Sequence, residues 1–416
     1  MRAPPALKHK QFVDYLLGSF VSNVGNNVQA WANAWHIYAI TQSSFMVGLL
    51  GVVRVVPLLV FSLFGGVVAD HYDRRKVLLA TQAAMAIVSL GLTVLTFYQI
   101  ASVAAVYVMV ALNAVARAFD GPVRQSVQVG LVPLEDFPNA ASLNGVTWRL
   151  SDVLGPVFAG LLIAVPHYGL MWCYALNFLS FFSLLAVVWR MPPIPLANSS
   201  DRPQSFREVI VQIKQGLKFV KTTPVVRHAM WIDFWATFWS GAEALIPAFA
   251  GKVLNLGPQG FGLLASSTGI GALLAAFGLS WFPTVRRQGR LVVLMIALFG
   301  FSTIGFGFAP NLPVACLCLA VVGASDMVST VMRQTIRQLA TPNEMRGRMN
   351  ATSSLFHISG PQLGDSEAGL AAHFWGERAS IKLGGAVCLF VALVWSRAKG
   401  LTEYEHPVSH DRPGQV

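Results

Sequence analysis

The sequence has 416 residues, of which 54% are hydrophobic and only 12% carry a formal charge. Soluble domains carry about 25% charged residues, so this composition excludes a soluble globular protein and indicates one that crosses a membrane several times. The formal net charge is +11, but the cations are spread over many short loops, which excludes a nucleic-acid-binding module.

Apolar stretches recur along the whole chain at a length that suits a lipid bilayer. A transmembrane helix needs about 20 predominantly apolar residues, and on this basis the sequence predicts an all-α membrane protein of twelve transmembrane helices. The expected spans cover residues 14–39, 45–69, 77–98, 102–129, 138–164, 169–190, 228–250, 259–281, 291–309, 313–339, 347–373 and 378–396. The cysteines all fall inside these runs, so neither a disulfide framework nor a metal site is expected.

The first expected span is unusually polar. Asn23, Asn26 and Asn27 form a stripe that is too polar to face lipid. These amides can line a cavity for a small-molecule substrate, or they can form hydrogen bonds between helices, worth about 0.6 kcal/mol each. Arg54, well inside the second span, is a further candidate for the cavity, because ionisable residues within spans are usually functional.

A charged turn, from Gly66 to Lys76, separates the second and third spans. It contains Asp70, Arg74 and Arg75, which cannot lie in hydrocarbon, because a charged side chain at a helix centre costs about 2.5–3.5 kcal/mol. The turn must therefore lie at a membrane face, and its cations assign that face to the cytoplasm.

The cations of the remaining loops alternate in the same way. Lysine and arginine gather in every second loop, whereas the loops between them, such as residues 41–44 and 98–101, have almost none. By the positive-inside rule we expect both termini in the cytoplasm, which requires an even number of spans.

Ionisable residues occur inside the fourth and fifth spans as well. Arg117, Asp120 and Arg124 lie at spacings that place them on one helix face, and Arg149 and Asp152 do the same in the next span. We consider all five candidates for a functional site, with Arg124, Arg149 and Asp152 expected in the substrate cavity. For the fourth-span set, the alternative is a self-neutralised Arg–Asp pair that only holds the helix against its neighbours.

Residues 191–227 are the longest polar segment and divide the chain. Ser205 and Glu208 have the spacing of a capping box, and the apolar residues after them repeat at helical spacing beside lysines, which predicts an amphipathic cytoplasmic helix. The expected parts are an N-terminal six-helix bundle at 1–190, this linker at 191–227, a C-terminal six-helix bundle at 228–398 and a cytoplasmic tail at 399–416.

Acidic residues dominate the spans of the second half. Asp233 and Glu243 lie in the seventh span, Asp326 in the tenth, and Asp365 and Glu367 in the eleventh. Because burial disfavours the charged form of a carboxylate, such groups can hold a proton. Asp326, the deepest, is the first candidate for proton coupling, with Glu243 and Asp233 after it. Asp365 and Glu367 are expected nearer an outer gate.

Two further residues of this half are candidates for the cavity wall. Arg333 is the main cation near these carboxylates, and Trp235 belongs to a run of aromatic residues that suits a large amphipathic ligand. Helix packing is the commoner role of such a run. Together the charges predict a cavity with a cationic wall from the first half and a carboxylate wall from the second.

The two halves are related as internal repeats. The tripeptide RQS at Arg124 returns as RQT at Arg333, an offset of 333 − 124 = 209 residues, and Gly155 has a counterpart in Gly364 at the same offset. One offset that holds across two spans predicts that the second six spans repeat the first six, as in a two-bundle transporter.

The charged turn resembles the signature loop between the second and third helices of the major facilitator superfamily. The matching residues are Gly66, Asp70, Arg74 and Arg75, although His71 stands where the family usually has a basic residue. In the family this loop braces the two bundles, so the resemblance implies that these four residues form a conformational latch.

Two other motifs are similar to those of the superfamily. Arg117-x-x-Asp120 resembles its fourth-helix motif, whose arginine is tied to proton transfer, although the family usually has glutamine at the position of Asp120. Gly155, Pro156 and Gly160 resemble a fifth-helix motif associated with antiporters, with one glycine of that motif replaced.

Finer matches occur at residues 119–125, 131–136, 139–140, 155–162 and 346–348 and in the linker at 206–220. With these, the chain over almost its whole length resembles the branch of this superfamily that holds the enterobactin exporter and macrolide efflux proteins. The resemblance implies two bundles in a bacterial inner membrane and proton-coupled export, by alternating access, of a small amphipathic molecule such as a siderophore or a drug-like compound. We expect a monomer in the lipid bilayer, without a cofactor or metal and without a nucleic-acid partner.

Other functions remain open at this point. A lysolipid flippase or a proton-coupled importer would have the same spans. An intramembrane enzyme fits poorly, because the sequence has no His-rich metal set, catalytic pair or nucleotide-binding loop. A channel fits the hydropathy but not the repeat with unequal halves.

Overall fold

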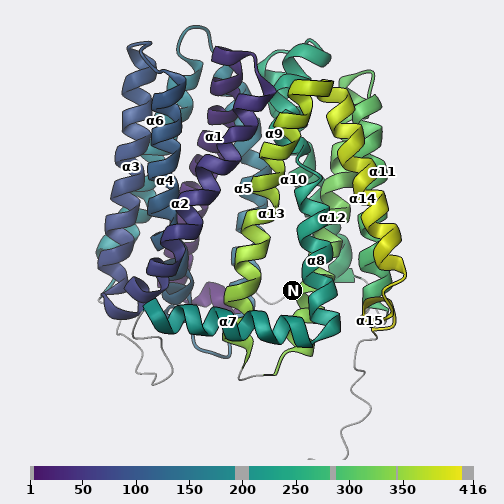
Figure 1. Ribbon diagram of the computed structural model, residues 1–416. Helices are drawn as coiled ribbons and strands as arrows, with labels where there is room; N and C mark the ends of the chain where they lie inside the picture. Colours follow the sequence, from purple (N-terminus) through teal and green to yellow (C-terminus); the bar gives the residue numbers. More distant parts are fainter. Residues whose placement is uncertain (1–3, 193–205, 282–286, 343–344, 405–416) are drawn as a thin grey trace, which may run out of the picture.

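The computed structural model describes residues 4–192, 206–281, 287–342 and 345–404. Within these ranges the chain forms long helices joined by short turns, and no strand occurs (Figure 1). The architecture is therefore the all-α one that the apolar periodicity predicts.

Six long helices correspond to the first six expected spans. After a short 3₁₀ turn, η1 (Pro5–Lys8), the helices are α1 (Lys10–Thr41), α2 (Ser44–His71), α3 (Arg74–Phe97), α4 (Val103–Gly130), α5 (Phe137–Ile163) and α6 (Gly169–Arg190). Side-chain caps fix the first residues of some of these helices. Ser43 accepts a hydrogen bond from the Met46 amide, and Ser102 accepts one from the Ala105 amide.

The second half begins with an amphipathic helix and contains one broken span. Its elements are α7 (Phe206–Thr222), α8 (Pro224–Phe238), α9 (Ala242–Ala248), η2 (Phe249–Val253), α10 (Pro258–Trp281), α11 (Gln288–Phe308), α12 (Leu312–Ala340), α13 (Arg346–Trp375), α14 (Glu377–Ser396) and α15 (Lys399–Thr402). The expected span 228–250 is thus divided into α8, α9 and the π-helical η2. Gly241 lies at the break and packs against the backbone of α13, where a side chain would not fit.

Hydropathy separates the helices into two kinds. Nine of those described are long and apolar enough to cross a membrane by length and composition alone: α2 to α6, α10, α11, α12 and α14. The other three expected spans are α1, the broken α8–α9 and α13, which carry more polar side chains. All three contribute residues to the cavity described below, so their polarity reflects an interior position.

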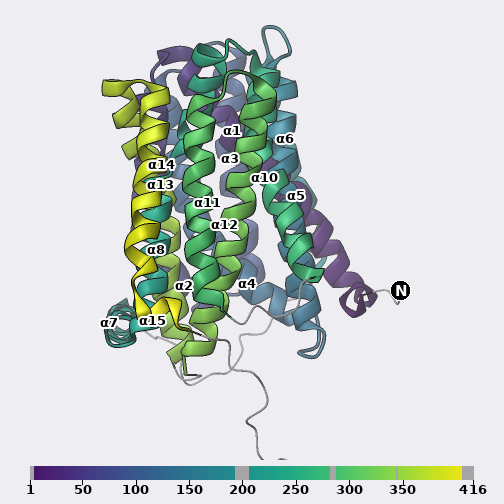
Figure 2. The same cartoon turned by 90° about the vertical axis from the view of Figure 1, so that its right-hand side faces the viewer.

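The helices from each half lie together (Figures 1 and 2). Helix α1 packs on α5 and α6, α2 packs on α4, and in the second half α11 packs on α12 and α14. Helix α7 runs across one end of the molecule, at the same end as η1 and α15. The boundaries proposed for the two bundles stay a prediction.

At the end opposite α7, the two halves touch along two glycine seams. A side-chain carbon built at Gly160 of α5 would lie 2.7 Å from the Cα of Gly262 in α10, and one built at Gly369 of α13 would lie 2.9 Å from the Cα of Gly48 in α2. Glycine at these positions allows backbone-to-backbone contact. We call this end the closed end.

A candidate substrate cavity between the two halves

A polar cavity lies between the halves and consists of two adjoining lobes. Lobe 1 has a volume of about 500 Å³ and is lined by α1, α2, α4 and α13, with Trp148 of α5 and Glu243 of α9. Lobe 2 has a volume of about 370 Å³ and is lined by α5, α8, α9, α10, α12 and α13, with Asn27 and Trp31 of α1 and Phe299 of α11. Four residues line both lobes: Asn27, Trp31, Glu243 and Asp365. The two volumes together suit a drug-sized ligand.

Lobe 1 contains two arginines, Arg54 and Arg117. Arg54 donates a hydrogen bond to the carbonyl oxygen of Ala30 at 3.2 Å, and it interacts electrostatically with Asp365 and Glu243. Arg117 lines the lobe from α4. It has neither an ion pair nor a hydrogen bond among the described residues. The cationic wall expected from the first half is therefore made by these two side chains.

Amide side chains surround these arginines. Asn26, Asn27 and Asn33 reach lobe 1 from α1, while Asn113 comes from α4 and Gln362 from α13. Three buried atoms of this set have no hydrogen-bond partner: Asn33 Oδ1, Asn113 Nδ2 and Gln362 Oε1. The wall of lobe 1 thus offers both donors and acceptors.

Lobe 2 is rich in carboxylates. Asp152 accepts a hydrogen bond from Asn27 at 3.3 Å and lies 3.7 Å from Arg149. Asp326 faces the lobe from α12 with 41% of its side chain exposed. Glu243, at the start of α9, has no ion pair among the described residues. These groups form the carboxylate wall that the sequence predicts, although Asp152 comes from the first half.

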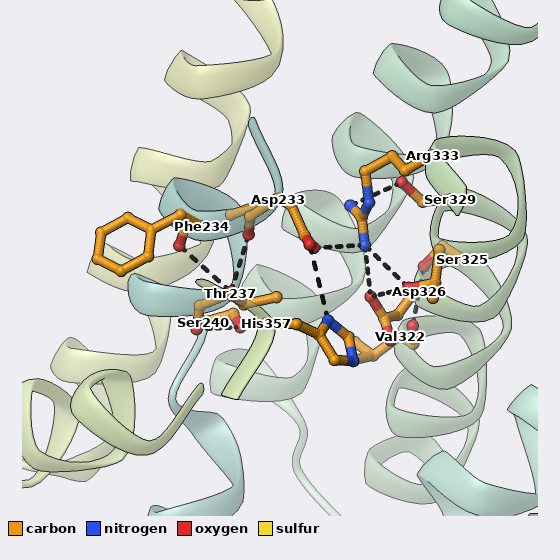
Figure 3. A network of polar contacts seen from close by, with 12 residues as sticks. Asp233, Phe234, Thr237, Ser240, Val322, Ser325, Asp326, Ser329, Arg333 and His357 are labelled. Carbon is orange, nitrogen blue, oxygen red and sulfur yellow. Dashed lines mark hydrogen bonds and ion pairs between the residues drawn. The ribbon is translucent and has the colours of Figure 1, made fainter. Parts of the chain in front are cut away.

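A buried ion pair lies directly behind lobe 2. Arg333 of α12 contacts Asp233 of α8 at 2.8 Å, and both side chains are almost fully buried. Asp326 lies 3.5 Å from the same guanidinium, and His357 lies 3.6 Å from Asp233 (Figure 3). Ser329 and Thr330 accept further hydrogen bonds from Arg333. Asp233 and Arg333 do not line the cavity, whereas Asp326 and His357 do.

The corresponding pair in the first half is also buried. Asp120 and Arg124, one turn apart on α4, form an ion pair. Asp120 also accepts hydrogen bonds from Gln82 at 2.7 Å and Thr81 at 3.0 Å, both from α3. Arg117 takes no part in this network. Asp120 therefore joins α3 to α4, as the structural alternative for this set supposes.

The expected latch is described only in part. The surroundings of Gly66 and the side chain of Asp70, near the end of α2, lie outside what the structure describes. Arg74 is buried at the start of α3. Arg75 donates hydrogen bonds to the carbonyl oxygens of Val188 and Trp189, the last turn of α6. In this conformation Arg75 thus contacts the first half.

The antiporter-like motif of α5 lies at helix contacts. Gly155 packs directly against Asn27 of α1. Gly160 forms the seam with Gly262, and the carbonyl oxygen of Pro156 lies 2.7 Å from a side-chain carbon built at Gly262. This motif therefore packs α5 against α1 at Gly155 and against α10 at Pro156 and Gly160.

The remaining candidates divide between the cavity and the packing. Asp365 lines both lobes, whereas Glu367 lines neither. Asn23 is buried and Trp235 packs against Trp231, Phe234 and Phe238, so neither reaches the cavity. In summary, the candidates that line the cavity are Asn26, Asn27, Arg54, Arg117, Arg149, Asp152, Glu243, Asp326 and Asp365, and those that do not are Asn23, Asp120, Arg124, Asp233, Trp235, Arg333 and Glu367.

Several lining residues did not stand out in the sequence. Asn113 was detectable, because it is a lone amide in an apolar span one turn before Arg117. Gln362 is likewise an amide within an expected span, and Asn33 belongs to the polar first span already noted. Trp31, at the junction of the lobes, gives no such signal, because an aromatic residue in a span is unremarkable. It packs edge-on against Phe261 of α10, with ring centroids 5.8 Å apart.

Metal ligation has no support in the part of the chain that the structure describes. There, no group of three or more His, Cys, Asp or Glu side chains is arranged to hold a metal ion. The cysteines Cys173, Cys316, Cys318 and Cys388 are free thiols.

A family model and a group of related proteins match most of this chain. The family model described as transmembrane secretion effector matches residues 3–412. Enterobactin exporters from Shigella boydii serotype 18 and Escherichia coli O81 are each 27% identical over 357 residues, which is 86% of this chain and 84% of theirs.

Solved structures share the fold at low sequence identity. A bacterial homologue of the iron transporter ferroportin, in an inward-facing state, has a TM-score of 0.71 at 17% identity and covers 94% of this chain and 98% of its own. A D-xylose–proton symporter has a TM-score of 0.71 at 14% identity with the same coverage. A peptide transporter has a TM-score of 0.74 at 12% identity and covers 95% of both chains. At these identities the likeness shows the fold alone.

Proposed function

Because the chain belongs to the transmembrane secretion effector family of the major facilitator superfamily, we propose that this secondary transporter exports a small amphipathic molecule by proton-coupled alternating access. Family membership also makes it a multi-pass membrane protein. The proposal concerns the direction of transport, the coupling ion and the class of substrate, which is siderophore-like or drug-like.

The cavity is the observation that carries the proposal. It is polar, lies between the two halves, and is closed at one end by the seams Gly48–Gly369 and Gly160–Gly262. Alternating access requires a central site and an interface that can close on one side of it. A channel would need a continuous path, and the glycine seams argue against one.

The charge of the loops supports an orientation of the protein in the membrane. The end that carries α7 is rich in cations, so we assign it to the cytoplasm of a bacterial inner membrane, with both termini on that side. The closed end then faces outward, and the cavity is in the state that loads substrate from the cytoplasm. The relatedness to enterobactin exporters supports the same direction.

Carboxylates at the cavity wall support proton coupling. Asp326 is the first candidate, because its carboxylate is partly exposed to lobe 2 and lies 3.5 Å from the Arg333 guanidinium. Glu243 and Asp365, at the junction of the lobes, are the next candidates. Asp233 is a weaker one, because Arg333 holds it in a buried pair.

Everted membrane vesicles provide the test. With an inwardly acidic proton gradient, vesicles containing the protein should accumulate enterobactin or a macrolide, and an uncoupler should abolish the accumulation. Asp326→Asn should lose gradient-driven accumulation at normal expression. The matched control is Glu403→Gln, since Glu403 lies exposed beyond the last span.

Other outcomes of the vesicle experiment would change the coupling residue or the function. Accumulation that is unaffected by the gradient would remove the proton from the proposal, and full activity of Asp326→Asn would move coupling to Glu243 or Asp365. Flux only in right-side-out vesicles would favour a proton-coupled importer. Movement of a fluorescent lysolipid between leaflets, without accumulation of either solute, would favour a lysolipid flippase.

A further inference from the structure

Lobe 1 differs from the other charged sites of the protein in having arginines without carboxylate partners in contact. Four other arginines of the spans have a carboxylate within 4.0 Å: Arg124, Arg149, Arg333 and Arg337. Arg54 contacts only a backbone carbonyl, and Arg117 has no ion pair or hydrogen bond among the described residues. Arg117 interacts electrostatically with Asp120, which Arg124 already pairs, and the two guanidinium groups of lobe 1 repel one another.

A pair of like charges in one buried site is costly unless a counter-charge joins it. The carboxylates nearest to Arg54, those of Glu243 and Asp365, lie at the boundary with lobe 2, and no ion pair joins them to either arginine. The side of lobe 1 between α2 and α4 therefore has an excess of positive charge.

The amides of lobe 1 are a second, independent observation. Asn33 is only 4% exposed, lines lobe 1, and its Oδ1 has no hydrogen-bond partner. Asn113 Nδ2 and Gln362 Oε1 are also buried atoms without a hydrogen-bond partner, although their side chains are only half-buried. An unpaired buried polar atom destabilises a protein, and rotation of a terminal amide is easy, so these groups are placed to complete their hydrogen bonds on a bound molecule.

Apolar side chains line the lobe beside these polar groups. Leu50 and Leu58 of α2, Val110 of α4 and Ile358 of α13 line it, with Trp31 and Trp148 at its sides. Apolar walls with a few convergent polar groups are typical of sites for organic ligands.

We infer that lobe 1 is a site for an organic anion, whose acidic group lies between Arg54 and Arg117 and whose apolar body lies along α2, α4 and Trp31. The amides of Asn33, Asn113 and Gln362 bind hydrogen-bonding groups next to the acid. This inference rests on the proposed use of the cavity as a substrate site and adds the charge of the substrate. Guanidinium groups suit the planar oxyanion of such a ligand.

A matched series of probes tests the charge preference without transport. Binding of 2-naphthoate, 2-naphthamide and 2-naphthylmethylammonium to the purified full-length protein in lipid nanodiscs is measured by equilibrium dialysis. We expect the carboxylate to bind at least tenfold more tightly than the neutral amide and the ammonium to bind most weakly, since a charge-assisted hydrogen bond is roughly twice as strong as a neutral one.

Variants locate the site. Arg54→Gln and Arg117→Gln should each remove most of the preference for the carboxylate, while Arg117→Lys should keep it because a cation remains. The matched control is Arg397→Gln, at the exposed end of α14, which should bind like the unmodified protein. Elution as a single species in size-exclusion chromatography shows that each variant is folded.

Three results would overturn the inference. They are equal binding of the three probes, absence of naphthoate binding at millimolar concentration, and a preference for the carboxylate that survives Arg54→Gln and Arg117→Gln. The outcome separates from that of the vesicle experiment. A carboxylate preference without proton-driven flux would refute only the proposed coupling, and flux without the preference would refute only the anion site.

Discussion

At the scale of single residues, the charged groups of this protein divide by whether a partner neutralises them. Asp233 and Arg333 are paired and almost fully buried, as are Asp120 and Arg124. Asp326 lies beside the first of these pairs but is open to the cavity. The same residue types therefore serve two purposes: the closed pairs join helices, and the open groups are available to a ligand or a proton.

This distinction predicts opposite effects for two neighbouring carboxylates. Asp233→Asn should destabilise the protein by about 3–5 kcal/mol, because Arg333 would remain buried without its main counter-charge. Asp326→Asn should change stability little, since its side chain is partly exposed. Thermal unfolding in detergent, followed by the loss of the monodisperse chromatography peak, measures both.

A double variant distinguishes the cost of leaving Arg333 buried without a counter-charge from the loss of the contact between α8 and α12. Asp233→Leu combined with Arg333→Met removes both charges at similar volume, and we expect it to regain most of the stability that Asp233→Asn loses. A double variant no more stable than Asp233→Asn would show that the ion pair is not what holds α8 to α12.

At the scale of helices, small residues decide how closely the two halves approach. Gly145 and Gly160 both lie on α5, but only Gly160 has backbone atoms of α10 within contact distance of a built side-chain carbon. The surroundings of Gly145 are open. Replacing each of these two glycines by alanine therefore distinguishes the effect of contact with α10 from the effect of helix propensity.

We expect Gly160→Ala to open the closed end and Gly145→Ala to leave it unchanged. The first substitution places a methyl group 2.7 Å from the Cα of Gly262, so α5 and α10 must move apart. Spin labels at Val165 and Asn255, in a background without the native cysteines, should show a longer mean distance only in the Gly160 variant. Equal distances in both variants would contradict this role of the seam.

The break between α8 and α9 also belongs to this scale. Thr237, Ser240 and Gly241 at the break line lobe 2, directly before Glu243. An interrupted helix in a span is tolerated where it borders a cavity, so the break explains how Glu243 reaches the junction of the two lobes. Residues 228–250 read as one apolar run in the sequence, because the interruption depends on packing of Gly241 against α13.

At the scale of the whole molecule, a polar contact joins the halves beside the glycine seams. Ser44 of α2 donates a hydrogen bond to Glu377 of α14 at 3.0 Å, and Lys252 of η2 lies 3.1 Å from the same carboxylate. Glu377 is buried, although Lys252 is exposed. A carboxylate held by both halves must lose a partner when they separate at this end.

Glu377→Ala should therefore favour the conformation that is open at this end. Spin labels at Ile40 and Phe374 should report a larger population of long distances than in the unmodified protein, and Glu403→Ala should behave like the unmodified protein. Unchanged distance distributions in Glu377→Ala would mean that the glycine seams alone hold the closed end.

Much of the architecture and part of the site follow from the sequence alone. Apolar runs of bilayer length determine the helices, because each backbone group in lipid must be paired within its own helix. Charged and amide residues within those runs, such as Arg54, Arg117 and Asp326, identify candidates for the cavity, because polar groups in a span are placed against protein or water.

Tertiary structure decides which of these candidates are available. Arg117 and Arg124 lie two turns apart on α4, yet only Arg124 meets a carboxylate. Asp233 and Asp326 come from different helices and meet the same arginine, but only Asp326 is open to the cavity. Whether a charge is paired or free depends on the side chains that neighbouring helices bring to it, and helical periodicity records only the face on which the charge lies.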